Sequence, residues 1–176
     1  MTTSSETGIK AWPQGFAINP RGKGPSPEMI EAYRDTPVAW ISDCLGRSVG
    51  SVGLNYYHGD VSLMMIGTAF TVRVRPGDNL MIHKAIELAQ PGDVIVVDAG
   101  GDCSQALIGN NMRTSAIRAK IAGFVLDGAL RDLAELADGK LPCTPRASLI
   151  AGQAKTDRER STCRSRAPAW WCIRAI

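Results

Sequence analysis

Hydrophobic and polar positions follow two different periods along the middle of the chain, and these periods separate helices from strands. "SPEMIEAYRDTP" predicts a helix, because Ser26 can cap it and Pro27 suits the first helical position. "VAWISDCLGR" predicts a second short helix that ends near Gly46. From Thr68 to Arg75 the pattern alternates as a half-buried strand does, and it closes on a Pro-Gly-Asp turn.

The segment from residue 80 to 139 continues as helix, strand, helix, strand and helix. Helical spacing predicts helices in "LMIHKAIELA", "NMRTSAIRAKIA" and "RDLAELADG", whereas "DVIVVDAGG" and "FVLDG" are apolar runs typical of strands buried on both faces. This order predicts parallel strands joined by right-handed crossovers, hence an α/β fold with a central, largely parallel sheet. Ligands of such sheets bind outside the carboxyl ends of the strands, here after Asp98 and Asp127.

Two loops should meet at that edge of the sheet. "GNNM", residues 109–112, begins a helix whose free amide groups favour an anion such as a carboxylate. The other loop follows an expected turn at Gly128 and carries Arg131 and Asp132. A guanidinium group binds carboxylates as a fork, and an aspartate is a hard oxygen ligand for Mg²⁺ or Mn²⁺. Together they would hold a small oxyacid between a metal and an arginine.

The same residues also have purely structural interpretations. Asp132 could cap the helix "DLAELA", with Glu135 completing a capping box, and Arg131 could be a surface charge. Asn110 is a good helix cap, and the glycines could serve tight turns. The residue pattern by itself leaves both interpretations open.

Composition and charge narrow the class of protein. The 176 residues, 44% of them hydrophobic, suit one domain with a proper core. We expect a cytoplasmic protein with reduced thiols and no membrane contact, because no apolar run is long enough for a membrane span or a signal peptide and the five cysteines show no metal-site spacing. Residues 1–141 hold 13 basic and 15 acidic side chains, which argues against a nucleic-acid-binding face.

Three stretches carry a resemblance to a known family. "PGDNLMIHKAIELAQPGDVIVVDAGGD", "ALIGNNM" and "GFVLDGALRDLAEL" closely resemble the regulator of ribonuclease E activity A-like (RraA-like) family, over about residues 27 to 141. That family includes class II 4-hydroxy-4-methyl-2-oxoglutarate and 4-carboxy-4-hydroxy-2-oxoadipate aldolases, and its name-giving branch inhibits ribonuclease E. The resemblance implies a layered α/β/β, swivelling-domain-like fold and a homotrimer.

The resemblance also implies roles for individual residues. The family's aldolase motif is an Asp, twenty intervening residues and an Arg-Asp pair, which makes Arg131 the catalytic, substrate-binding arginine and Asp132 the metal ligand. Asn110 stands where the family carries the first Asp. The implied substrate-binding backbone stretch is Gly109, Asn110, Asn111 and Met112.

The implied reaction is a retro-aldol cleavage that depends on a divalent cation, Mg²⁺ or Mn²⁺. A small 2-oxo acid would be cleaved to pyruvate, and oxaloacetate decarboxylation would pass through the same enolate. The alternative is a non-catalytic protein that binds and inhibits ribonuclease E. We discount a methyltransferase, because no glycine-rich S-adenosylmethionine loop follows a first strand.

The pattern divides the chain into an N-terminal arm (1–26), an RraA-like α/β domain (27–141) and an atypical tail (142–176). The arm is rich in Gly, Pro, Ser and Thr, and we expect it to be ordered only if it packs on the body. From Pro142 onward neither a helix nor a strand period continues. One permitted back-translation, read one base out of frame, gives a family-like continuation. The tail is therefore predicted to be frameshifted, which sequencing the coding DNA would test.

Overall fold

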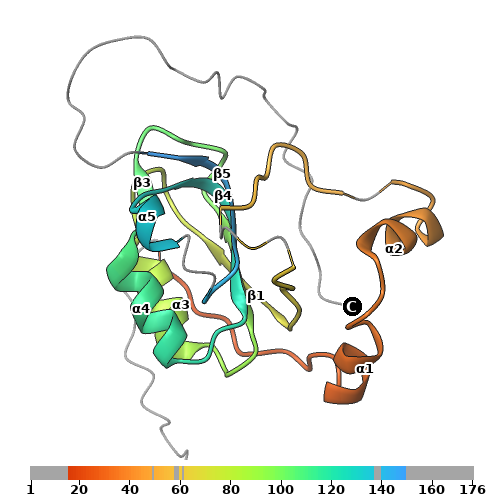
Figure 1. The fold of residues 1–176 in the computed structure, drawn as a ribbon. Coiled ribbons are helices and arrows are strands. Elements are labelled where there is room, and N and C mark those ends of the chain that lie inside the picture. Colours follow the sequence, from red (N-terminus) through yellow and green to blue (C-terminus); the bar gives the residue numbers. More distant parts are fainter. Residues whose placement is uncertain (1–15, 49, 58–59, 61, 137–139, 150–176) are drawn as a thin grey trace, which may run out of the picture.

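The computed structural model describes residues 16–48, 50–57, 60, 62–136 and 140–149 of the chain (Figure 1). The helices are α1 (Pro27–Ala32), α2 (Val38–Cys44), α3 (Leu80–Leu88), α4 (Asn110–Arg118) and α5 (Leu133–Leu136). The strands are β1 (Ala69–Arg73), β2 (Val94–Asp98), β3 (Ala106–Ile108), β4 (Gly123–Leu130) and β5 (Cys143–Ser148). In this part of the chain, no helix is both long and apolar enough to cross a membrane.

The five strands form one parallel sheet with β4 at its centre. β2 pairs with the first five residues of β4, β3 pairs with its last two, and β5 pairs along most of its length. Since β5 overlaps both β2 and β3 in register, β2 and β3 must share the opposite edge of β4. The expected α/β fold with a central parallel sheet is confirmed, whereas the second β layer of the expected α/β/β arrangement is not among the described residues.

Helices α3 and α4 lie side by side over one face of the sheet (Figure 1). Their apolar faces, including Ile82 and Met112, are buried in one cluster with Ile95, Phe124 and Leu126 of the sheet. Each such side chain contributes roughly 1.5–3 kcal/mol when it is removed from water. Val96 and Asp98 of β2 and Val125 and Asp127 of β4 alternate with these buried residues and are only partly buried, so the helices cover this part of the sheet from one side.

The described part of the N-terminal arm is held to the body by an ion pair. Both terminal nitrogens of Arg21 bond the Asp93 carboxylate, at 2.6 and 2.7 Å, and Asp93 is buried. The hydrogen bonds with Asp93 raise the pKa of Arg21. The Gln90 N–H also donates to this carboxylate, at 2.8 Å. A buried carboxylate needs such partners, and Arg21 therefore supplies the packing contact that the arm requires.

The turn expected at Gly128 is wrong, because β4 runs on through this residue to Leu130. A Cβ atom at Gly128 would lie 2.8 Å from Leu107 Cδ1 of β3. The glycine thus permits close packing between neighbouring strands instead of turning the chain. β3 itself escaped prediction, since three residues are too few to show a period.

The expectation that no strand follows Pro142 is wrong for the six residues of β5. Cys143 and Pro145 are buried and alternate with partly buried neighbours. The main-chain N–H groups of Asn55 and Tyr57 donate to the carbonyl oxygens of Pro145 and Cys143, at 2.9 and 3.3 Å. Main-chain pairing therefore forms this strand, where the side-chain pattern was too short and too polar to predict it. From residue 150 onward the predicted tail lies outside the described residues, and its frameshift stays a prediction.

The placement of β5 predicts how the cysteines react. Burial raises the pKa of Cys143 from 9.0 to about 12, whereas Cys44 is exposed. At pH 8 a shift of this size lowers the reactive thiolate fraction by about 1,000-fold. A maleimide should therefore label Cys44 in the folded chain and spare Cys143, as read by peptide mass spectrometry, with equal labelling of both in concentrated urea. Equal labelling without urea would contradict the placement of β5.

Candidate functional site

The two predicted loops do meet, and Gly109 is the point of contact. It is the N-cap residue of α4. A Cβ atom at Gly109 would lie 2.7 Å from Asp132 Oδ2 and 2.9 Å from Arg131 Nε. Its φ of −132° is available to any residue, so the requirement for glycine here is steric. The absence of a side chain lets both charged groups pack against the start of α4.

The side chain of Asp132 caps α4 instead of the helix that follows it. Its Oδ2 atom accepts a hydrogen bond from the Asn110 N–H at 2.9 Å. Its own backbone has a φ of +64°, in the left-handed region, which Asp tolerates better than most residues. Its carbonyl oxygen accepts from the N–H groups of Glu135 and Leu136, which starts α5. The capping-box interpretation of this aspartate is therefore wrong for its carboxylate.

The first turn of α4 holds the other expected binding groups. Asn110 is the first helical residue and not the cap, and no side chain at the cap position bonds the helix start. The first intrahelical bond runs from the Arg113 N–H to the Gly109 carbonyl, at 3.1 Å. The N–H groups of Asn111 and Met112 thus have no acceptor within the helix. These two amides are the donors that α4 can offer an anion, because Asp132 already uses that of Asn110.

Arg131 is held by its backbone and leaves its guanidinium group exposed. Its N–H donates to the Ile108 carbonyl at 3.0 Å, which joins the end of β4 to the end of β3. Its Nε atom lies 3.7 Å from Asp132 Oδ2, and 57% of its side chain is exposed. The terminal guanidinium nitrogens form no hydrogen bond with any described residue, so they can bind a carboxylate as a fork.

The surroundings of Asp132 fit a weakly held divalent cation. Oδ2 is oriented by the Asn110 N–H, whereas Oδ1 has no hydrogen-bond partner among the described residues. Within that part of the chain no three His, Cys, Asp or Glu side chains gather to hold a metal. A cation at this carboxylate would thus take its other ligands from water and from a bound oxyacid. Mg²⁺ is commonly bound in this way, through one or two carboxylates.

The carboxylates of Asp98 and Asp127 are engaged elsewhere. The two residues are register partners on β2 and β4, and each forms an ion pair with an arginine of the neighbouring strand. Arg73 Nε lies 2.9 Å from Asp98 Oδ2, and Arg146 bonds Asp127. The arginines offset the repulsion between two adjacent like charges, so these aspartates have a structural role on the sheet.

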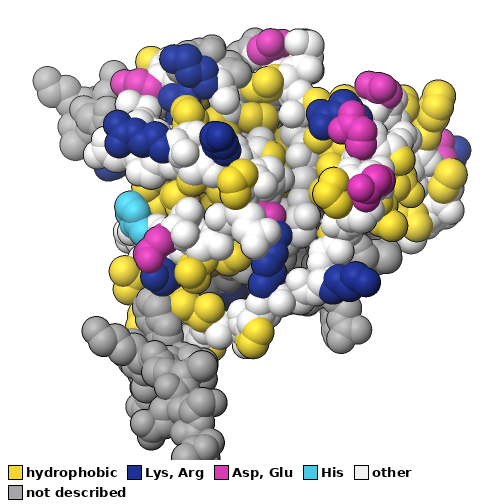
Figure 2. Space-filling view, turned by 90° about the horizontal axis from the view of Figure 1, so that it is seen from below, with side chains coloured by type: hydrophobic (Ala, Val, Ile, Leu, Met, Phe, Trp, Pro, Cys, Tyr) yellow, Lys and Arg dark blue, Asp and Glu magenta, His cyan; other side chains and the backbone are white. Residues whose placement is uncertain are grey.

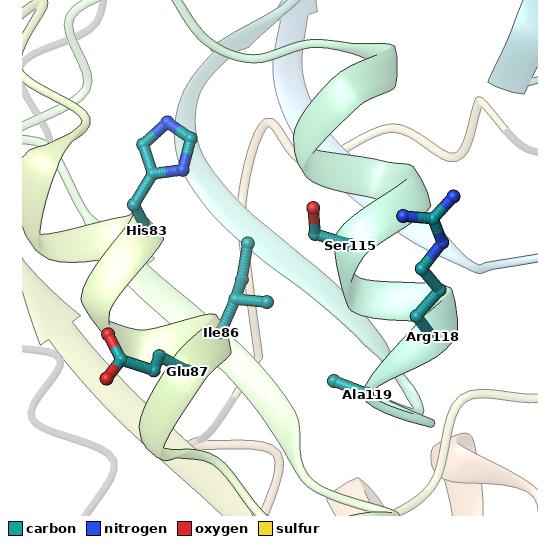
Figure 3. Close-up of a pocket in the computed structure, with 6 residues that line it drawn as sticks. All are labelled: His83, Ile86, Glu87, Ser115, Arg118 and Ala119. Carbon is teal, nitrogen blue, oxygen red and sulfur yellow. The ribbon is translucent and has the colours of Figure 1, made fainter.

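A shallow depression of about 480 Å³ lies between α3 and α4, away from the expected site residues (Figure 3). Its floor is formed by Ile86 and Ala119, and its rim includes the exposed His83. None of the expected substrate or metal residues lines it. His83 is therefore placed on the helix surface, and His58 lies outside the described residues.

The steric role of Gly109 can be tested by adding one methyl group. Gly109→Ala should displace Asp132 and Arg131 from the start of α4 and lower the free energy of unfolding by about 1–3 kcal/mol, the usual cost of overpacking. Gly22→Ala is the matched control, because no atom lies within 4 Å of the position of its Cβ. Urea unfolding of both variants gives the comparison. Equal stabilities would show that Gly109 does not make this close contact.

Two relatives of known sequence carry the name of an aldolase. A "Putative 4-hydroxy-4-methyl-2-oxoglutarate aldolase" of Halalkalibacterium halodurans is 38% identical over 134 residues, 73% of this chain and 61% of the relative. A "4-hydroxy-4-methyl-2-oxoglutarate aldolase" of Thermus thermophilus is 35% identical over 96 residues, 52% of this chain and 58% of the relative. The chain thus spans about three fifths of the length of these relatives.

Two solved structures share the fold at 27% identity. One is the RNA-processing inhibitor RraA of Thermus thermophilus, with a TM-score of 0.57 over 65% of this chain and 68% of that one. The other carries the name S-adenosylmethionine: 2-dimethylmenaquinone methyltransferase and comes from Geobacillus kaustophilus, with a TM-score of 0.58 over 65% and 70%. The profile of the family described as "RraA-like: Aldolase/RraA" matches residues 38–164, past the predicted boundary at residue 141. The chain therefore belongs to the RraA-like family.

Proposed function

We propose that the chain is a divalent-metal-dependent aldolase that cleaves 4-hydroxy-4-methyl-2-oxoglutarate-type 2-oxo acids to pyruvate, with oxaloacetate decarboxylation as a side activity. The observation that carries this proposal is the convergence at Gly109 of an exposed guanidinium, an open carboxylate oxygen and a helix start. These are the groups that an enolate-forming reaction of a small oxyacid requires. The aldolase names of the relatives support the same reaction class.

The main-chain amides and the arginine side chain would bind different parts of the substrate. The N–H groups of Asn111 and Met112 would bind the substrate carboxylate, and the guanidinium of Arg131 would bind the 2-oxo oxygen. As the C4 hydroxyl loses its proton to water, C4 becomes the carbonyl carbon of one pyruvate and the C3–C4 bond breaks. The electron pair of that bond moves through C2 to the 2-oxo oxygen, and the resulting enolate, stabilised by Arg131, takes up a proton from water at C3 to give the second pyruvate. In oxaloacetate the bond from C3 to the departing carboxylate breaks instead and leaves the same enolate.

Asp132 is the residue that would hold Mg²⁺ or Mn²⁺, through Oδ1. The cation, when bound, supplies a second positive charge for the developing enolate oxygen. The Asn110 N–H keeps the carboxylate of Asp132 in place before any ligand arrives. Asn110 brings no charge of its own, where the family motif has Asp, so the attraction for the cation comes from Asp132 and from the anionic substrate.

Turnover of oxaloacetate tests the proposal directly. The 176-residue chain should release pyruvate with Mg²⁺ and not with EDTA, as measured by coupled reduction of the product. Arg131→Ala should lower kcat/KM by about 100-fold, since about 2.7 kcal/mol of transition-state stabilisation is typical for a donor to a developing oxyanion. Arg118→Ala is the matched control, because this exposed arginine lies at the other end of α4.

Two results would contradict the aldolase proposal. One is the absence of any metal-dependent pyruvate release from either oxaloacetate or 4-hydroxy-4-methyl-2-oxoglutarate. The other is an Arg131→Ala variant that turns over as fast as the Arg118→Ala control. The first result would leave the rival function, a non-catalytic protein that binds and inhibits ribonuclease E.

The rival function is favoured by one comparison, the structural neighbour named as an RNA-processing inhibitor. Inhibition through a surface contact does not need an open carboxylate or a free arginine fork. An Arg131→Ala chain that still inhibits ribonuclease E in a cleavage assay, while the unaltered chain lacks turnover, would therefore support this function over the aldolase.

We also propose a homotrimer, for which the exposed apolar side chains of α1 and α2 give support. Neither helix has a buried residue. Figure 2 shows hydrophobic side chains on the surface of the part of the molecule that α1 and α2 form. The exposed large apolar side chains of this segment are Met29, Tyr33, Val38, Trp40 and Leu45. Exposed apolar surface of this kind marks interfaces.

Light scattering tests the assembly. The chain should elute with the mass of three 18.8 kDa protomers. A charge at the most exposed of these side chains, in Val38→Glu, should shift the population toward single chains, because an ionised carboxylate is expensive to bury. A single-chain mass for the unaltered protein would contradict the trimer.

A further inference from the structure

The turn that precedes α3 lies beside the candidate site. Gly77, in the sequence "PGDN", has a φ of +74°, as the tight turn requires. A Cβ atom at Gly77 would lie 2.4 Å from Oε1 of Gln105, so the amide of Gln105 covers this glycine. Gln105 directly precedes β3, whose end leads into Gly109. The turn thus touches the segment that enters the site.

Asn79 makes a second contact with the site, at the first turn of α4. It occupies the N-cap position of α3 but forms no side-chain cap. That task falls to Asp78, whose Oδ1 accepts from the Leu80 N–H at 2.9 Å. The Nδ2 atom of Asn79 instead donates to the sulfur of Met112, at 3.8 Å. Asn is among the residues that most often cap a helix with the side chain, so an N-cap Asn79 that instead contacts a second helix is unusual.

Met112 is the residue through which this contact reaches the site. Its side chain is buried, and its N–H is one of the two α4 amides without an acceptor in the helix. A contact at the sulfur therefore links Asn79 to the first turn of α4. The direction of the Asn111 and Met112 amides relative to Arg131 depends on the orientation of that turn.

We propose that Asn79 is a positioning residue of the oxyacid site. It holds the first turn of α4 through Met112, so that the N–H groups of Asn111 and Met112 can bind the same oxyacid as the guanidinium of Arg131. A hydrogen bond to a thioether is weak, and its loss should affect the alignment of the site more than the stability of the fold. Binding sites need alignment to about 0.5 Å and 10–20°, which a single contact in the supporting structure can decide. The inference rests on the proposed function.

The Asp132 carboxylate lies on the segment after β4 and not on α4, which gives the experiment its internal control. Its hydrogen-bond partner among the described residues is the Asn110 N–H, and none of its bonds there goes to Asn79 or Met112. Loss of the Asn79 contact should therefore weaken the binding of an oxyacid more than the affinity for the cation. A general loss of folding would lower both.

Calorimetry on the 176-residue chain with oxalate, a mimic of the pyruvate enolate, measures the effect in the presence of Mg²⁺. Asn79→Ala and Met112→Leu remove the same contact from its two ends, and each should weaken oxalate binding about three- to tenfold. The double variant should lose no more than the worse single variant, because the two residues act as a pair. Asn55→Ala is the matched control, since this asparagine bonds the Arg146 carbonyl, away from α4.

Several outcomes would overturn the inference. One is an Asn79→Ala chain that binds oxalate as tightly as the Asn55→Ala chain. Another is a loss of oxalate binding that merely follows a fall in Mg²⁺ affinity or in the free energy of unfolding. If the unaltered chain itself fails to bind oxalate with Mg²⁺, the proposed function fails, and the inference fails with it.

Discussion

The hydrogen bond from the Asn110 N–H to the Asp132 carboxylate joins the carboxyl end of β4 to the start of α4, and the site depends on it. It can form because Gly109 has no side chain where Asp132 and Arg131 approach. The bond serves two purposes at once, since it satisfies a helix-terminal donor and orients a carboxylate. Arg131 is the neighbouring residue, so the fork, the open oxygen and the free amides all lie within one small region.

The rest of the fold provides a rigid base for this contact. β3 and β4 approach closely because Gly128 leaves room for Leu107. Helices α3 and α4 bury their apolar faces on the same side of the sheet, and a close-packed interior keeps the strand ends in place. Arg21 fastens the described part of the arm to Asp93 by an ion pair at another point of the body.

The site is exposed, and among the described residues it offers one carboxylate oxygen without a hydrogen-bond partner. The proposed chemistry would therefore depend on the ligands that complete the site, namely a cation and an anionic oxyacid that can neutralise each other. Asn110 keeps the size of an aspartate without its charge, so the substrate would supply a larger share of the attraction for the cation. In such a site small errors of alignment matter, which agrees with the role proposed for Asn79, a residue outside the immediate contacts.

Local sequence was sufficient for the elements whose period is long enough to read. These are α1 to α4, β1, β2 and most of β4, together with the helix predicted in "RDLAELADG", within which α5 lies. The residue pattern pointed to the candidate site, Gly109 to Met112 with Arg131 and Asp132, and the resemblance to the family implied a role for each residue. The short strands β3 and β5 form because they pair with β4. A hydrophobic pattern over three or six residues is too short to predict such a strand. Tertiary structure also decided which helix Asp132 caps and where Asn79 points, because both bonds join residues far apart in the chain.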